Sequence, residues 1–184
     1  MHVNTVNCMK LSDDKHRVVL DVARFVGLAV GIALALYYLP NYFFYEKIVG
    51  QNAAYIMRLI GMKGTVWVNG DRVFLNQFEI QRMCTGVQVI AVFFGIIVAI
   101  PKVPVKKRIL AFSIVAVSVH LANIGRIAFE IWLLYAGVLP WSLAHYPTGL
   151  ILGIISVAFL IVAADYFIPQ IGDLTLSVLD SFRS

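Results

Sequence analysis

Three side chains that could take part in one reaction lie at the borders of long apolar segments: Cys84, Arg126 and His145. A cysteine attacks as the thiolate, so its thiol needs either a lowered pKa or a nearby base. A histidine can accept that proton and later return it, and an arginine supplies positive potential. These residue types are together what nucleophilic catalysis by a thiol requires.

The residues beside the cysteine add to this interpretation. Arg82 precedes Cys84 by two positions and supplies a second positive charge. Thr85 and Gly86 follow it where a helix is expected to begin, and the free N–H groups and dipole of a helix N-terminus favour both a thiolate and an oxyanion. We therefore expect Arg82, Thr85 and Gly86 to support the active site.

A row of polar residues marks a later apolar segment, HLANIGRIAFE. His120, Asn123 and Arg126 recur every three residues and so share one face of a helix. Glu130 follows Arg126 at the spacing of a helical ion pair. Polar residues on a spanning helix usually point into the bundle. We expect Asn123 to support the site and His120, which lies deeper, to be packed behind it.

Each of the three main candidates also has a simpler explanation. Cys84 could be a small buried hydrophobe, Arg126 an anchor that reaches the membrane border, and His145 an ordinary histidine of an interfacial loop. Their combination, considered below by depth, favours chemistry over three separate structural roles.

The composition is that of a membrane protein. Of the 184 residues, 60% are hydrophobic and 14% are charged, whereas soluble domains have roughly half and about a quarter. The net charge of +5 comes from basic residues at membrane borders, which argues against a nucleic-acid partner. Neither Cys8 nor Cys84 has a metal-binding spacing, so we expect no metal and no cofactor. No cleavable signal peptide is recognised.

Four segments have the roughly 20 apolar residues that a spanning helix needs. They are residues 18–39, 85–100, 109–135 and 147–168. Short basic loops stay in the cytoplasm, which places the tail 1–17 and the loop 101–108 there, together with the tail 169–184. The prediction is an all-α polytopic membrane protein, with about four transmembrane helices in a single domain, in the cell membrane. Cys8 would be cytoplasmic and so could not pair with Cys84.

The segment 40–84 would then lie on the extracytoplasmic side. Ile48, Ala53, Ile56, Leu59 and Ile60 predict an amphipathic helix that lies on or against the membrane domain. Two β-branched and aromatic runs flank the pair at positions 69 and 70, Asn-Gly, a strong hairpin signal. A small β-hairpin over 65–75 is therefore expected on the outer face.

The depths of the candidate residues agree. At about 1.5 Å per helical residue, Cys84 lies roughly 26 Å from Pro101, Arg126 roughly 27 Å from Arg108, and His145 roughly 30 Å from its own helix's inner end. The hydrocarbon core is about 30 Å thick. Three helices thus bring all three side chains to the same outer layer.

At these residues the chain resembles the exosortase/archaeosortase family of membrane-embedded cysteine transpeptidases. The resemblance covers about residues 75 to 168. It is carried by Glu79 ahead of the CTG of residues 84 to 86, by the NIGR that contains Asn123 and Arg126, and by His145 before the last span. It implies Cys84 as nucleophile, with Arg126 and His145 as the other catalytic residues. The CTG triplet favours the archaeosortase branch.

The resemblance also implies the substrate. Exported proteins that end in a short motif, a transmembrane helix and a basic tail would be cleaved outside the membrane, held as a thioester on Cys84 and transferred to an amine acceptor, such as a lipid head group. Two alternatives remain open from the residues alone. One is a non-enzymatic transporter or assembly subunit, and the other is a hydrolase or acyltransferase that uses the same cysteine.

Overall fold

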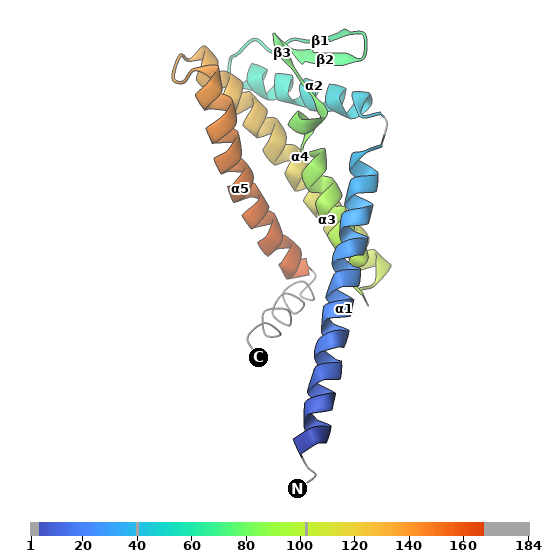
Figure 1. The fold of residues 1–184 in the computed structure, drawn as a ribbon. Helices are drawn as coiled ribbons and strands as arrows, with labels where there is room; N and C mark the ends of the chain where they lie inside the picture. Colours follow the sequence, from blue (N-terminus) through green and yellow to red (C-terminus); the bar gives the residue numbers. More distant parts are fainter. Residues whose placement is uncertain (1–3, 40, 102, 168–184) are drawn as a thin grey trace.

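The computed structural model describes residues 4–39, 41–101 and 103–167. This part forms five α-helices, a single-turn 3-10 helix and three short strands (Figure 1). Helices lie over all four predicted spans: α1 (Asn4–Tyr37), α3 (Val87–Ala99), α4 (Val105–Tyr135) and α5 (Trp141–Phe167). Helix α2 (Phe43–Leu59) lies across one end of this bundle, together with the strands. We call this the sheet end.

Two of these helices begin earlier than the apolar runs suggested. Helix α1 is continuous from Asn4, and α5 begins at Trp141, six residues before Pro147. A proline inside a membrane helix is tolerated because neighbouring groups satisfy the carbonyl that it leaves without a donor. His145, considered above as a loop residue, therefore lies within a helix.

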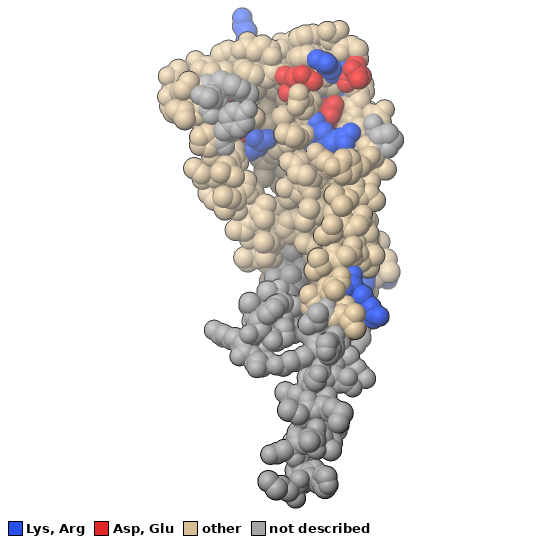
Figure 2. All heavy atoms as spheres, in the orientation of Figure 1, with Lys and Arg blue, Asp and Glu red and all other residues tan. Residues whose placement is uncertain are grey.

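The chain is a membrane protein, as the apolar lengths of its helices and many exposed large hydrophobic side chains indicate. Leu20–Tyr37 and Val105–Tyr135 are long and apolar enough to cross a bilayer, whereas Val87–Ala99 and Gly149–Val162 are shorter apolar stretches. About four crossings therefore stays a prediction. Figure 2 shows charged side chains at the sheet end and near the loop between α3 and α4, with an uncharged surface between them.

The predicted hairpin is confirmed and has a third strand. β1 (Val66–Asn69) pairs antiparallel with β2 (Arg72–Leu75), with Val66 opposite Leu75, and Gly70 in the turn has a φ of 63°. β3 (Phe78–Glu79) adds to the free edge of β2. The sheet leads directly into the segment that carries Cys84.

Helix α2 packs between the sheet and α4, as an amphipathic helix against the domain should. Its buried residues Val49, Ala53 and Met57 recur every four positions. Leu59 and Ile60, assigned to the apolar face, are instead exposed. Ala53 of the predicted face is buried and Ile56 packs against the same core, so the buried face is shifted from the predicted one by the elements that pack on the helix.

Two apolar clusters support the bundle, and the candidate site lies between them. One joins α2, the sheet and the second half of α4, around Met57, Leu75 and Ile131. The other joins α3 to the first half of α4 and to α5, around Ile97 and Leu160. The residues of α4 that carry the polar row lie where the first cluster passes into the second.

Helices α1 and α3 come close together at Gly95 of α3, and a substitution there tests this packing. A Cβ added at Gly95 would overlap the backbone oxygen of Ala29. Gly95→Ala should therefore force the two helices apart and lower the free energy of unfolding by about 1–3 kcal/mol. Thermal unfolding of the purified protein in detergent measures this.

The matched control is Gly27→Ala in α1, where an added Cβ meets no atom within 4 Å. An equal loss of stability in both variants would contradict the close approach of α1 and α3.

Candidate active site

Cys84 lies in the 3-10 turn η1 (Arg82–Thr85), between the sheet and α3. The fully buried Thr85 shapes this turn, because its hydroxyl donates to the carbonyl of Arg82 at 2.6 Å and accepts the N–H of Val87 at 3.3 Å. The Cys84 N–H also donates to the carbonyl of Gln81 at 2.7 Å. Thr85 thus supports the site by fixing the backbone that presents the cysteine.

Gly86 turns the chain from η1 into α3. Its φ of 74° lies in the left-handed region, which side chains with a Cβ rarely adopt. A Cβ at this position would also lie 3.0 Å from Cγ1 of Val119 on α4. A glycine is therefore required both by the bend and by the close approach of α4.

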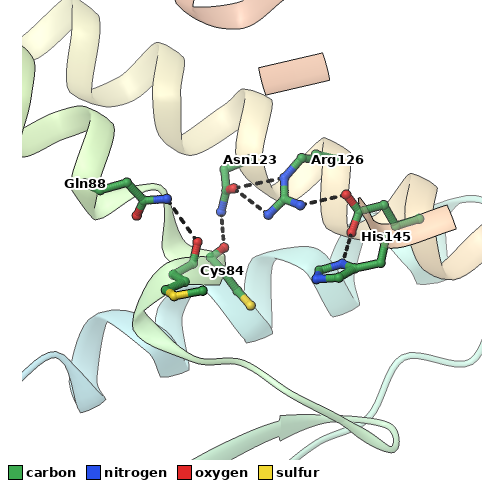
Figure 3. Close-up of polar contacts among 7 residues, drawn as sticks. Cys84, Gln88, Asn123, Arg126 and His145 are labelled. Carbon is green, nitrogen blue, oxygen red and sulfur yellow. Dashed lines mark hydrogen bonds and ion pairs between the residues drawn. The ribbon is translucent and has the colours of Figure 1, made fainter. Parts of the chain in front are cut away.

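A continuous chain of polar contacts runs from the cysteine to α5 (Figure 3). Nδ2 of Asn123 donates to the carbonyl of Cys84 at 2.6 Å, and its Oδ1 accepts Nε and Nη2 of Arg126 at 3.4 and 3.2 Å. Nη1 of Arg126 meets Oε1 of Glu130 at 2.6 Å, and Oε2 of Glu130 lies 3.0 Å from Nδ1 of His145. Three elements, η1, α4 and α5, are thereby joined.

The three principal candidates line one cleft of about 1020 Å³ between α3, α4 and α5. Cys84, Arg126 and His145 lie near its sheet end, and Figure 3 shows the thiol and the imidazole on the same side of the polar chain. Farther from the sheet the lining is mainly apolar, with Val89, Val119, Leu150, Val157 and Leu160. The cleft therefore joins a polar end to a long, mainly apolar part.

Burial raises the pKa of the Cys84 thiol above its ordinary value. A backbone hydrogen bond at Gln81 and the charge of Arg126 lower this pKa, while the charges of Glu130 and Glu46 raise it. Desolvation is the largest effect, so the positive potential expected around the cysteine does not by itself produce a thiolate. A nucleophilic reaction at this thiol would therefore need a base.

Within the described part of the chain, neither Arg82 nor Glu79 is among the residues that line the cleft. Nη1 of Arg82 donates to the carbonyl of Tyr37 at 3.0 Å, and its guanidinium lies 4.9 Å from the ring centre of Tyr42. It therefore ties the end of α1 to η1. Glu79 lies in β3 opposite Phe74 and, in the part of the chain that the structure describes, is outside the cleft lining.

His120 belongs to a second polar cluster, between α4 and α2. Its Nε2 lies 2.9 Å from Nδ2 of Asn52, and its Nδ1 lies 3.3 Å from the hydroxyl of Tyr45. Its two ring nitrogens thus face α2, which agrees with a packed histidine.

Helical spacing predicted the contact of Glu130 with Arg126, but not the contact with His145. Glu130 is 3% exposed and bridges two helices. A lone carboxylate within an apolar segment was the signal that could have directed attention to it, because a buried charge must be paired.

The residues of this cleft fall within one family match. Residues 18–165 match the family of transmembrane exosortases (Exosortase_EpsH). The chain belongs to this family. Comparisons with curated proteins and with solved structures give no match. Exosortase membership implies a membrane cysteine peptidase or transpeptidase with a role in sorting exported proteins.

The raised thiol pKa gives this exosortase-family protein a defined pH dependence. In a Cys8→Ala background, alkylation of Cys84 by iodoacetamide should rise only at higher pH than for an exposed cysteine, whose pKa is about 8.5, because burial disfavours the thiolate. Arg126→Gln should move the rise to still higher pH, since the charge of Arg126 lowers this pKa.

Arg82→Gln serves as the control, because that guanidinium is engaged by Tyr37 and Tyr42. A larger shift in Arg82→Gln than in Arg126→Gln would contradict the placement of these two cations.

Proposed function

We propose that this protein is a cysteine transpeptidase that cleaves the C-terminal sorting signal of exported proteins and transfers them to an amine acceptor, such as a lipid head group. The observation that carries the proposal is the polar chain from the Cys84 carbonyl to His145 at the end of an apolar cleft. Cys84, Arg126 and His145 act as the catalytic residues, in the archaeosortase branch of the family.

In the proposed first half-reaction, His145 takes the thiol proton while sulfur bonds to the substrate carbonyl carbon. Arg126 stabilises the negative oxygen that forms, as preorganised donors do in other acyl transfers. The peptide C–N bond then breaks, and the proton on His145 passes to the departing amine. A thioester on Cys84 remains.

In the second half-reaction an acceptor amine attacks the thioester, His145 takes its proton, and the thiol is restored. With water in place of the amine, the same residues would give a protease. The raised thiol pKa fits this scheme, because a neutral resting thiol reacts readily only when a base is in place to take its proton.

The shape of the cleft supports a membrane-anchored substrate. Its apolar part extends along α5 as far as Leu160, so a substrate helix lying there would place its outer end beside Cys84. The exposed Lys106 and Lys107 lie at the far end, at the start of α4. Basic residues of this kind face the cytoplasm, which would put the site on the extracytoplasmic side.

A transporter or assembly subunit is less well supported. A transport path would need polar groups along its length, whereas the cleft beyond His145 is lined mainly by apolar side chains. The residues of the polar chain lie at one end and are linked to one another, while farther along α5 the lining adds one hydroxyl, Ser156.

Cys84→Ala tests the nucleophile. A sorting-signal protein co-expressed with the native chain should lose its C-terminal helix and gain the mass of an acceptor, whereas with Cys84→Ala it should stay intact. Mass spectrometry of the purified substrate measures both changes, with Cys8→Ala as the matched control that should process normally. Cleavage without added mass would make the protein a protease, and cleavage by Cys84→Ala would exclude this cysteine as nucleophile.

Arg126→Lys tests the role of the guanidinium. Lysine keeps the charge but not the planar set of donors that reaches both Asn123 and Glu130. Processing should fall by roughly 10²- to 10³-fold, the loss typical of removing one oxyanion donor, while the protein still inserts in the membrane. Normal processing by Arg126→Lys would reduce Arg126 to a membrane anchor.

A further inference from the structure

We propose that Glu130 is a positioning residue that holds the His145 imidazole as a base toward Cys84. This inference rests on the proposed function, because it assigns a role within the same site. It rests on three observations: the burial of the carboxylate, the use of both its oxygens, and the close approach of α5 at Gly149.

The two oxygens of the Glu130 carboxylate contact different partners, and the two contacts have different effects. Oε1 meets Nη1 of Arg126 at 2.6 Å, which compensates a charge that is costly to bury. The contact with Oε1 alone is enough to pair the positive charge of Arg126 with the carboxylate. Oε2 is directed to Nδ1 of His145 at 3.0 Å, on a different helix. The second contact therefore fixes the orientation of a ring and not only the balance of charge.

The contact also selects the tautomer of the histidine. An ionised carboxylate only accepts hydrogen bonds, so Nδ1 of His145 must donate. The neutral ring then carries its lone pair on Nε2, which is the nitrogen on the side of Cys84 in Figure 3. A carboxylate behind a histidine orients the ring and stabilises its charged form when it takes a proton.

Gly149 lets α5 come close enough for this contact. A Cβ on Gly149 would lie 3.0 Å from Oε1 of Glu130 and 3.3 Å from Nη1 of Arg126. A side chain there would push the carboxylate or α5 aside by a few tenths of an ångström. Gly149 thus gives a way to disturb the contact without changing any ionisable group.

The charged groups around the thiol and the imidazole determine whether Glu130→Gln should speed or slow alkylation of Cys84. Arg126 and Glu130 on α4 and Glu46 on α2 act on the Cys84 thiol. The charges of Glu130 and Glu46 both raise its pKa. If Glu130 acted through its charge alone, Glu130→Gln would favour the thiolate and speed alkylation. If it positions His145, Glu130→Gln takes the base away from the thiol and slows alkylation.

The first experiment measures iodoacetamide alkylation of Cys84 at pH 7 in Cys8→Ala membranes. We expect slower alkylation in Glu130→Gln, and no further slowing when that change is added to His145→Ala. Glu46→Gln is the matched control, because it removes a carboxylate that acts on the same thiol through its charge, and it should not slow the reaction. Unchanged or faster alkylation in Glu130→Gln, or added slowing in the double variant, would overturn the proposal.

The second experiment covers the case in which Glu130→Gln fails to fold. Gly149→Ala is compared with Gly153→Ala, one turn along the same cleft, where an added Cβ meets nothing within 4 Å. Gly149→Ala should slow both the alkylation of Cys84 and substrate processing. Gly153→Ala should leave the alkylation rate of Cys84 unchanged. Equal alkylation rates of Cys84 in Gly149→Ala and Gly153→Ala would overturn the proposed role of Glu130.

Processing of a co-expressed sorting-signal substrate completes the test. Glu130→Gln should lower its rate by roughly 10²- to 10⁴-fold, the range that general acid–base catalysis contributes. If the native chain fails to process substrates, the proposed function fails. The alkylation experiments need no substrate and still decide whether Glu130 positions His145.

Discussion

The pairing of one buried carboxylate with two partners is the constraint on which the site depends. A charge removed from water is costly unless other charges and hydrogen bonds compensate it, and Glu130 is 3% exposed. Its oxygens bind Arg126 on its own helix and His145 on α5. Separating these groups would leave the buried carboxylate unpaired, which is energetically unfavourable. The two contacts of Glu130 therefore also hold α5 against α4 at the sheet end.

The same chain of contacts sets the position of the thiol through the backbone. Asn123 joins the Arg126 guanidinium to the carbonyl of Cys84, so the turn η1 is tied to α4 at the residue that carries the sulfur. Thr85 and Gly86 fix the shape of that turn, one by hydrogen bonds and the other by its left-handed backbone. These contacts thus fix the backbone that carries the thiol, and hydrogen bonds hold the guanidinium and the imidazole.

The arrangement places a polar, linked cluster at the end of an apolar cleft. Beyond this cluster the cleft is lined mainly by apolar side chains, and the cluster itself lies beside the sheet. Desolvation raises the pKa of the Cys84 thiol, so the proposed reaction would depend on a well-oriented base. In the proposed mechanism the orientation of His145 therefore matters more than it would for an exposed cysteine with an ordinary pKa.

The sequence by itself determined the helical membrane character, the approximate positions of the apolar helices, the hairpin and the contact of Glu130 with Arg126, because hydropathy, turn chemistry and i,i+4 spacing are local properties. It also indicated that Cys84, Arg126 and His145 share one depth. Tertiary structure decided the rest. Arg82 binds the end of α1 because Tyr37 and Tyr42 meet it there, the thiol pKa is raised because neighbouring helices exclude water, and Glu130 meets His145 because α5 packs at Gly149. Spacing along one chain fixes depth in a membrane, but which faces of separate helices meet depends on how those helices pack.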